Sequence, residues 1–305
     1  MLRIISINLF AMLGILLITG CSETGSKKND GGQNQRLSAY ECLTAPSCGR
    51  IMVAAHRGNH KDYPENSLAS IRAAARIGAD FAEVDVRDTS DGRLVLMHDS
   101  SVDRTTDGTG EVRDMSWEQI QQLNLDGGDA SDPESNKVPL FSDVLALAKQ
   151  LNIMIYVDQK TDRWDLVLAE IQAGDYEHTA LVRDSIDNLV LMKEADDNVL
   201  VMPPCDDTKQ LEGFKERISS LFIIELSGAP DQELVSDFHR AGVLVQQDVL
   251  AMGDSKALVG NYTGWKDYVE AGVDLIQTEY PYLFIPALEQ WQQTGDFPEE
   301  GPPAM

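Results

Sequence analysis

The chain has 305 residues, of which 43% are hydrophobic and 25% charged, so it can bury the core of one large domain or two ordinary ones. This composition excludes a chain that is disordered throughout. The formal charge of −25 argues against nucleic acid as a partner, because binding a polyanion needs clustered Lys and Arg side chains that replace its counterions.

The first 20 residues have the layout of a secretory signal. One positive charge at Arg3 precedes an apolar run from Ile4 to Thr19, shorter than the roughly 20 apolar residues that a membrane-spanning helix needs. The following "LITGC" resembles the lipobox of bacterial lipoproteins, which implies cleavage before Cys21 and diacylation of that cysteine. We therefore expect a protein anchored to a membrane of the bacterial cell envelope, the outer membrane facing the periplasm if the organism has one. A plain N-terminal membrane anchor is the alternative.

A polar, Gly-rich stretch follows, and we interpret residues 21–50 as the lipidated cysteine and a flexible tether. Export places the remaining cysteines in an oxidising compartment, where Cys42 and Cys48 can close a small loop. The alternative is that both are free, buried thiols. Cys205 is then left over.

From residue 51 onward, short β-branched runs alternate with segments of helical period, which indicates successive βα units around a parallel sheet. Eight units fit a closed (β/α)8 TIM barrel, which typically takes about 250 residues, better than an open sheet. We assign the barrel to 51–293 and expect the Pro-rich, acidic end at 294–305 to be a disordered tail. The predicted strands are 51–56, 81–87, 153–158, 180–183, 199–203, 221–226, 243–248 and 274–279.

One interval breaks this alternation. A short extra strand within "RLVLMHD" (93–99) follows the second strand, and a long loop leads from it to the helix predicted at 142–152. A loop this long in a compact barrel is usually functional or forms a small cap, and it starts on the face where barrel enzymes keep their sites. We therefore expect a small insertion after the second strand.

Carboxylates close the second and third strands. Glu83 and Asp85 end one strand and Asp158 ends the next, so all three should meet at the mouth where the carboxyl ends of barrel strands converge. Glu83 and Asp85 lie two residues apart and face the same side, where they repel each other unless a cation neutralises them. Oxygen ligands of this kind favour Ca²⁺ or Mg²⁺ over Zn²⁺. The alternative for each acid alone is a salt-bridged or rim residue.

Two of the five histidines are expected at the same mouth. His56 closes the first strand and His98 follows the extra strand, so they are the predicted proton donor and acceptor. His60 lies in the loop after the first strand and is a candidate substrate contact. His178 and His239 are interpreted as structural or exposed residues.

Two cationic side chains are expected beside these acids and histidines. Lys160 lies two residues after Asp158 and should therefore face the same mouth. Arg57 directly follows His56, and its guanidinium can bind a phosphate through two parallel hydrogen bonds. The pair predicts a phosphate-binding site next to the metal.

Four segments resemble, in order, the motifs of the glycerophosphodiester phosphodiesterase family. They are "HRGN" with "PENS" (64–67), "EVDVRDTSDGRLVLMHD" (83–99), "DRTTDGTG" (103–110) and "GVDLIQTEYP" (272–281). The resemblance covers nearly the whole expected barrel. It implies a TIM barrel with a small insertion, and metal-dependent hydrolysis of small-molecule glycerophosphodiesters to glycerol 3-phosphate and an alcohol.

The resemblance also implies roles position by position. His56 and His98 match the catalytic pair of the family. Glu83 and Asp85 match two of its metal ligands, and Arg57 matches a phosphate contact. Asn66 of "PENS" lies beside the site in the family, and its alternative role is the N-cap of the following helix. Asp158 stands where the family often has Glu, and Glu279 where it usually has Asp. The strand at 243–248 lacks the Trp-rich form common in the family, and we place it and Glu279 where the alcohol is read.

Two rival functions follow from the same residues. A lysophospholipase D or sphingomyelinase D-like enzyme would act on membrane lipid through an apolar entrance, to which 281–286 or 100–110 can contribute. A surface lipoprotein that binds phosphodiesters or glycans without turnover is the other rival. Paired histidines argue against it, because a binding protein has no need of two proton-transfer groups.

Overall fold

The computed structural model describes residues 37–45 and 48–304. The expected signal segment at 1–20, the lipidation site Cys21 and most of the expected tether lie outside the described residues. Among the helices that are described, none is both long and apolar enough to cross a bilayer.

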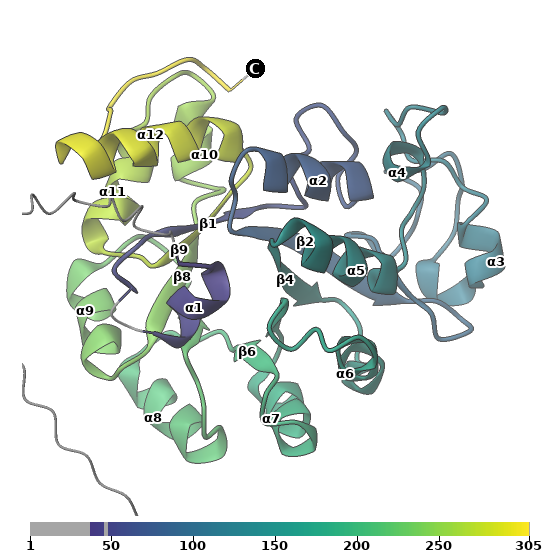
Figure 1. The fold of residues 1–305 in the computed structure, drawn as a ribbon, viewed down its shortest axis with the longest axis horizontal. Coiled ribbons are helices and arrows are strands. Elements are labelled where there is room, and N and C mark those ends of the chain that lie inside the picture. Colours follow the sequence, from purple (N-terminus) through teal and green to yellow (C-terminus); the bar gives the residue numbers. More distant parts are fainter. Residues whose placement is uncertain (1–36, 46–47, 305) are drawn as a thin grey trace, which may run out of the picture. The chain divides into compact units, whose positions relative to one another are not determined.

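Eight parallel strands form the predicted (β/α)8 barrel (Figure 1). They pair in the order β6-β5-β4-β2-β1-β9-β8-β7. A parallel bridge between Pro204 and Glu225 joins the two ends of this order and nearly closes the ring. The strands are β1 (Met52–Ala55), β2 (Phe81–Asp88), β4 (Met154–Gln159), β5 (Ala180–Arg183), β6 (Leu200–Met202), β7 (Ile223–Glu225), β8 (Leu244–Asp248) and β9 (Leu275–Thr278).

Helices follow the strands and cover the outside of the barrel (Figure 1). α5 shows why they form: Val144, Leu145 and Ala148 recur at helical spacing and are fully buried against the sheet. Asn152 then ends that helix in the left-handed region, with φ 53°. These helices are α2 (Leu68–Arg76), α5 (Phe141–Leu151), α6 (Trp164–Ala173), α7 (Ile186–Ala195), α8 (Thr208–Arg217), α9 (Gln232–Arg240), α10 (Gly253–Ala257), α11 (Thr263–Ala271) and α12 (Pro281–Thr294).

The barrel interior changes from apolar to polar along the strands. Near their amino ends, Phe81 and Met154 belong to one buried apolar cluster. Glu83 lies two residues beyond Phe81, and Tyr156 two residues beyond Met154, so both point to the same interior side. The polar residues at the mouth therefore stand on a closed apolar floor.

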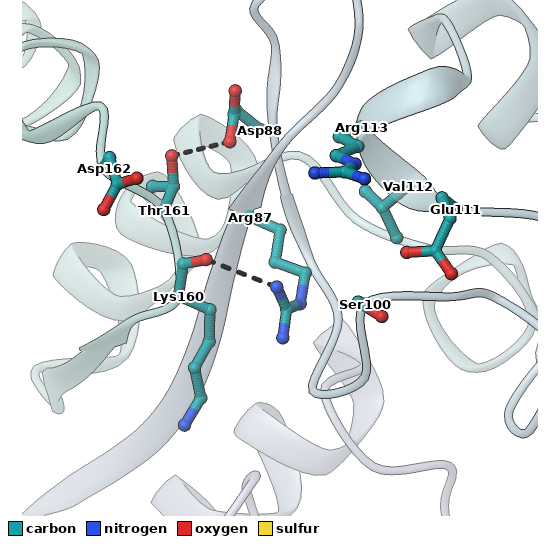
Figure 2. A pocket seen from close by; sticks show the side chains of 9 residues that line it. All are labelled: Arg87, Asp88, Ser100, Glu111, Val112, Arg113, Lys160, Thr161 and Asp162. Atoms are coloured by element: carbon teal, nitrogen blue, oxygen red, sulfur yellow. Dashed lines mark hydrogen bonds between the residues drawn. The ribbon is translucent and has the colours of Figure 1, made fainter.

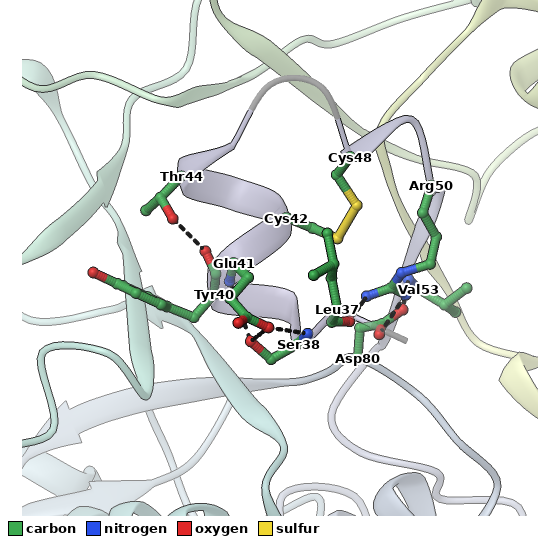
Figure 3. Close-up of a disulfide and its surroundings, with 10 residues drawn as sticks. All are labelled: Leu37, Ser38, Tyr40, Glu41, Cys42, Thr44, Cys48, Arg50, Val53 and Asp80. Carbon is green, nitrogen blue, oxygen red and sulfur yellow. Dashed lines mark hydrogen bonds and ion pairs between the residues drawn. A yellow bond between two sulfur atoms is a disulfide. The ribbon is translucent and has the colours of Figure 1, made fainter. Parts of the chain in front are cut away.

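A short helix, α1 (Ala39–Thr44), covers the bottom of the barrel within the region expected to be a tether. Cys42 and Leu43 are each 1% exposed and pack in the interior cluster that includes Met52. The tether expectation is therefore wrong for the described residues up to 50, because Cys42 and Leu43 bury their side chains in the barrel interior. The predicted disulfide between Cys42 and Cys48 is confirmed (Figure 3).

The predicted insertion after the second barrel strand is confirmed. Its strand β3 (Leu94–Leu96) pairs antiparallel with β2. The segments η2 (Val112–Asp114), α3 (Trp117–Ile120) and α4 (Pro133–Asn136) follow. The insertion has a small core of its own, formed by Val95, Met97, Val102, Val112, Ile120, Leu125 and Val138. This core gives the residues at the mouth a fixed wall on one side.

The described end of the chain, up to residue 304, is packed rather than disordered. Phe297 and Ala304 are 4% and 6% exposed. The Gly301 N–H donates to the Gly260 carbonyl at 2.9 Å, and the Tyr262 hydroxyl donates to the Pro302 carbonyl at the same distance. The expectation of a disordered tail is wrong here, because the bias toward Pro and acidic residues hides two apolar anchors.

The Cys42–Cys48 bond should contribute to the stability of the barrel. Its ends are six residues apart, and closing so short a loop in the unfolded chain is worth about 2 kcal/mol. The C42S/C48S variant should therefore lose about this much free energy of unfolding, measured by denaturant titration. Reduced wild type is the matched control, and an unchanged midpoint in both would show that packing of α1 alone holds the segment.

Candidate active site

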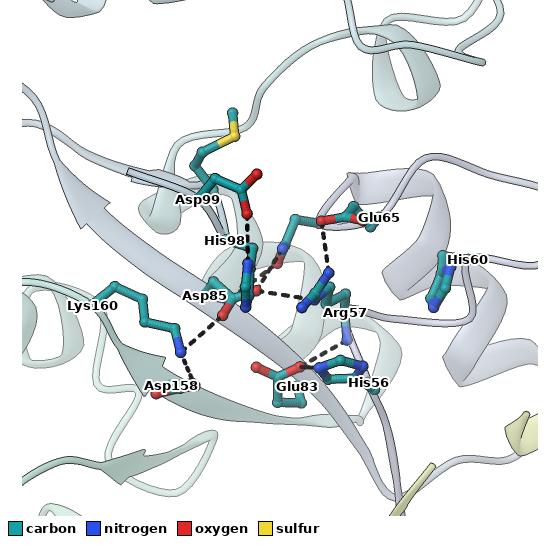
Figure 4. A network of polar contacts seen from close by, with 12 residues as sticks. His56, Arg57, His60, Glu65, Glu83, Asp85, His98, Asp99, Asp158 and Lys160 are labelled. Carbon is teal, nitrogen blue, oxygen red and sulfur yellow. Dashed lines mark hydrogen bonds and ion pairs between the residues drawn. The ribbon is translucent and has the colours of Figure 1, made fainter. Parts of the chain in front are cut away.

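Three carboxylates converge at the mouth of the barrel (Figure 4). Glu83 and Asp85 come from β2, and Asp158 comes from β4, where it lies in register with Asp85. One oxygen of each acid lies within 4.8 Å of the others. Glu83 and Asp85 are 2% and 1% exposed, so their negative charges are hardly screened by water. The structure thus brings together the three acids predicted from the sequence.

The electrostatics of these acids are unfavourable without a further positive charge. Burial, followed by the negative charges of Asp85 and Asp158, raises the pKa of Glu83 well above its usual value. The Lys160 ammonium lies 2.5 Å from Asp158 Oδ2 and 3.5 Å from Asp85 Oδ1. Burial opposes the charge of Lys160, but the contacts with the acids raise its pKa overall. The ammonium offsets only part of the negative charge.

The loop after β1 fixes two of the acids by hydrogen bonds. The backbone N–H of Arg57 donates to Glu83 Oε2 at 2.8 Å. Asn66 Nδ2 donates to Asp85 Oδ2 at 2.8 Å, and the Asp85 N–H donates to Asn66 Oδ1 at 3.1 Å. Arg57 and Asn66 both have positive φ, 52° and 56°, which aims these groups at the acids. Asn66 is therefore not the helix N-cap; Ser67 caps α2.

His56 is held from behind by Glu279. Its Nδ1 lies 2.6 Å from Glu279 Oε1, while its Nε2 lies 3.8 Å from Glu83 Oε2. His60 Nε2 contacts the other Glu279 oxygen at 2.5 Å. Burial disfavours the charge of Glu279, but its bonds to the two histidines bring its pKa well below the usual value. Glu279 is thus the shared carboxylate partner of His56 and His60.

His98 has its own carboxylate. Its Nδ1 lies 2.7 Å from Asp99 Oδ1. Arg104 donates to Asp99 at 2.6 Å and to both oxygens of Glu65 at 2.8 and 2.9 Å, and Glu65 also accepts from Arg57 at 3.1 Å. The hydrogen bond from Arg104, followed by that from His98, lowers the pKa of Asp99 well below its usual value. This series of hydrogen bonds could not be predicted from the sequence, because it links residues from two separate loops.

A further ion pair lies on the other side of Asp158. Arg183, the last residue of β5, donates to Glu225 Oε2 at 2.6 Å and lies 3.6 Å from Asp158 Oδ1. Burial raises the pKa of Glu225 even though Arg183 acts against it. Both residues close strands, which is the one signal in the sequence that could have found them.

The remaining two histidines have structural contacts. His178 stacks on Tyr40 with ring centroids 4.0 Å apart. His239 Nε2 lies 2.7 Å from Asp274 Oδ2. The interpretation of both as structural or exposed residues is confirmed.

The three acids fit a hard divalent cation. All the atoms available to coordinate a metal are carboxylate oxygens, the ligands that Ca²⁺ and Mg²⁺ prefer. Asp158 Oδ1 is buried and, within the described residues, accepts no hydrogen bond. A cation would provide this partner and would remove the repulsion between Glu83 and Asp85. Glu83, Asp85 and Asp158 are therefore the residues that can hold a metal.

Comparison with known proteins agrees with this arrangement. Residues 56–260 match the glycerophosphoryl diester phosphodiesterase family. Human glycerophosphodiester phosphodiesterase 1 is 39% identical over 162 residues, 50% of this chain and 49% of that protein. The glycerophosphodiester phosphodiesterase of Caldanaerobacter subterraneus is 36% identical over 112 residues, 37% of this chain and 46% of that protein. The chain thus spans about half or less of the length of these relatives.

Solved structures show the same fold. A glycerophosphoryl diester phosphodiesterase from Parabacteroides distasonis superimposes with a TM-score of 0.69 at 20% identity, over 82% of this chain and 90% of that one. An Oleispira antarctica phosphodiesterase in complex with the product sn-glycerol-3-phosphate superimposes with a TM-score of 0.65 at 20% identity. This superposition covers 79% of this chain and 97% of that one. The family match covers most of the barrel and includes His56, the three acids and His98. The chain therefore belongs to the glycerophosphoryl diester phosphodiesterase family.

Proposed function

We propose that the protein is a metal-dependent phosphodiesterase that hydrolyses glycerophosphodiesters to glycerol 3-phosphate and an alcohol. The observation that carries this proposal is the convergence of three carboxylates beside His56. Hydrogen bonds through Asp99, Arg104, Glu65 and Arg57 connect His98 to the same site. Each histidine also has a carboxylate partner of its own. Family membership supports the reaction class. The product bound to the Oleispira antarctica phosphodiesterase supports glycerol 3-phosphate as the common half of the substrates.

In this proposal Glu83, Asp85 and Asp158 hold Ca²⁺ or Mg²⁺. When bound, the cation polarises a phosphoryl oxygen and stabilises the charge that builds up in the transition state. Lys160 and Arg57 carry positive charges beside these acids. Their role is to bind the remaining phosphate oxygens, and the planar Arg57 guanidinium suits two parallel hydrogen bonds.

The two histidines divide the proton transfer. A carboxylate at Nδ1 favours the tautomer with a proton there, which leaves the Nε2 lone pair free. One histidine takes a proton from the attacking oxygen, which belongs either to water or to a glycerol hydroxyl of the substrate. Attack by the hydroxyl gives a cyclic phosphate, which water must then open to release glycerol 3-phosphate. The other, in its protonated form, gives its proton to the leaving alkoxide. Glu279 and Asp99 stabilise whichever imidazolium forms.

We also propose that the enzyme is exported and held at the cell envelope by lipid on Cys21. The Cys42–Cys48 disulfide supports export, because such bonds persist in oxidising compartments. The lipobox resemblance of "LITGC" supports the anchor.

Alanine at His56 or His98 should lower kcat by about 10² to 10⁴, the usual cost of losing a general acid or base. Release of glycerol 3-phosphate from a purified variant measures the loss, and circular dichroism verifies the fold. His178→Ala is the matched control, because that histidine stacks on Tyr40. Near wild-type turnover in either variant would remove that histidine from the mechanism.

Chelation and dialysis should abolish hydrolysis, and adding Ca²⁺ and Mg²⁺ back separately should identify the ion that restores it. Metal should also raise the free energy of unfolding of the wild type, by about 2.7 kcal/mol at a hundredfold excess over Kd. Asp158→Asn should lose this gain, whereas Asp267→Asn, at an exposed acid on α11, should keep it. Full activity in the chelated enzyme would contradict the metal assignment.

Cys21→Ala should abolish labelling with a radioactive fatty acid and release the protein from the membrane fraction. Fractionation of cells expressing either form, followed by immunoblotting, measures the release. Retention of the variant in the membrane fraction would show that something other than this lipid anchors the protein.

A further inference from the structure

A polar cavity of about 370 Å³ lies beside the proposed active site, between the insertion and the loop after β4 (Figure 2). Lys160 borders both spaces: it lines the cavity, and its ammonium contacts Asp158 and Asp85. A ligand group in this cavity would therefore lie next to a phosphate held at the metal site. The mechanism proposed above assigns no role to the cavity.

Arg87 is held rigidly in the cavity wall. Its Nε and Nη2 donate to the His98 carbonyl at 3.2 and 2.7 Å, and its Nη1 donates to the Lys160 carbonyl at 3.3 Å. These bonds use three of the five N–H donors of a guanidinium. Bonds to two backbone carbonyls thus fix the conformation of the Arg87 side chain. The remaining two N–H groups and the positive charge of the guanidinium are available to bind a ligand.

Arg113, from η2, brings a second guanidinium to the same cavity. It is exposed and, within the part of the chain that the structure describes, forms no hydrogen bond or ion pair. Acids also line the cavity, but in the described residues none of them is ion-paired with Arg87 or Arg113. These acids are Asp88, Glu111 and Asp162. The Arg87 and Arg113 guanidinium groups therefore line one cavity, and in the described residues neither is ion-paired with the acids of its wall.

We propose that this cavity is an anion subsite that takes a carboxylate or a phosphate carried by the alcohol half of the substrate. The inference rests on the proposed phosphodiesterase function and adds the substrate class. Arg87 and Arg113 bind the anion through charge-assisted hydrogen bonds, and the Ser100 hydroxyl lines the same cavity.

Two substrate pairs separate the anion from the rest of the alcohol. Glycerophosphoserine differs from glycerophosphoethanolamine by a carboxylate, and glycerophosphoinositol 4-phosphate differs from glycerophosphoinositol by a phosphate. Binding is measured by calorimetry with Ca²⁺ or Mg²⁺ on the full chain carrying His56→Ala, so that turnover does not interfere. Hydrolysis of the same diesters by the wild type is measured separately.

The anionic member of at least one pair should bind more tightly, and Arg113→Gln should reduce that preference about tenfold, as expected for loss of a hydrogen bond to a charged group. Arg76→Gln, at an exposed arginine at the end of α2, is the matched control and should keep the preference. A preference within the serine and ethanolamine pair indicates a carboxylate site, and a preference within the inositol pair indicates a phosphate site.

Equal affinity within both pairs, or a preference that survives Arg113→Gln, would overturn the subsite. If the wild type hydrolyses none of the diesters but the preference depends on Arg113, the subsite stands and the proposed reaction fails. If none of the four diesters binds, both proposals fail.

Discussion

Repulsion among three carboxylates at the mouth of the barrel is the constraint on which the rest of the site depends. Glu83, Asp85 and Asp158 bring one oxygen each within 4.8 Å, and two of them are almost fully buried. Burial of unpaired charges costs several kcal/mol each unless hydrogen bonds and counter-charges offset it. The Asn66 amide and the Lys160 ammonium offset part of this cost, and a divalent cation held by the three acids would offset the remainder.

The barrel makes such an arrangement possible because its strands fix side chains in register. Strand alternation directs Glu83 and Asp85 to the same side, and pairing of β2 with β4 puts Asp158 opposite Asp85. The apolar residues nearer the amino ends of these strands, with α1 beneath them, form a rigid floor. The loop after β1 then adds Arg57 in a left-handed conformation, which other packing must hold in place. The packed apolar cluster thus holds in place the left-handed backbone at Arg57 and the buried acids at the mouth of the barrel.

The sequence predicts the features that follow from periodicity and fails where loops fold onto one another. Strand ends were sufficient to locate Asp158, because alternation and convergence are properties of every parallel barrel. Glu279 also closes a strand, yet its bonds to His56 and His60 depend on how the loop after β1 folds. Helix α1 and the packed tail were missed for a related reason, since a few apolar side chains in a polar stretch leave no periodic signal. The link from Arg104 to Asp99 and Glu65 likewise needs tertiary structure.

The central claim is that these acids form a metal site, and crystals grown in Mn²⁺ test it most directly. The account predicts an anomalous difference peak at about 2.0 to 2.6 Å from oxygens of Glu83, Asp85 and Asp158, the range for hard cations. It also predicts that the Lys160 ammonium moves away from Asp158. A map without such a peak, in which Lys160 still contacts Asp158 and Asp85, would contradict the account.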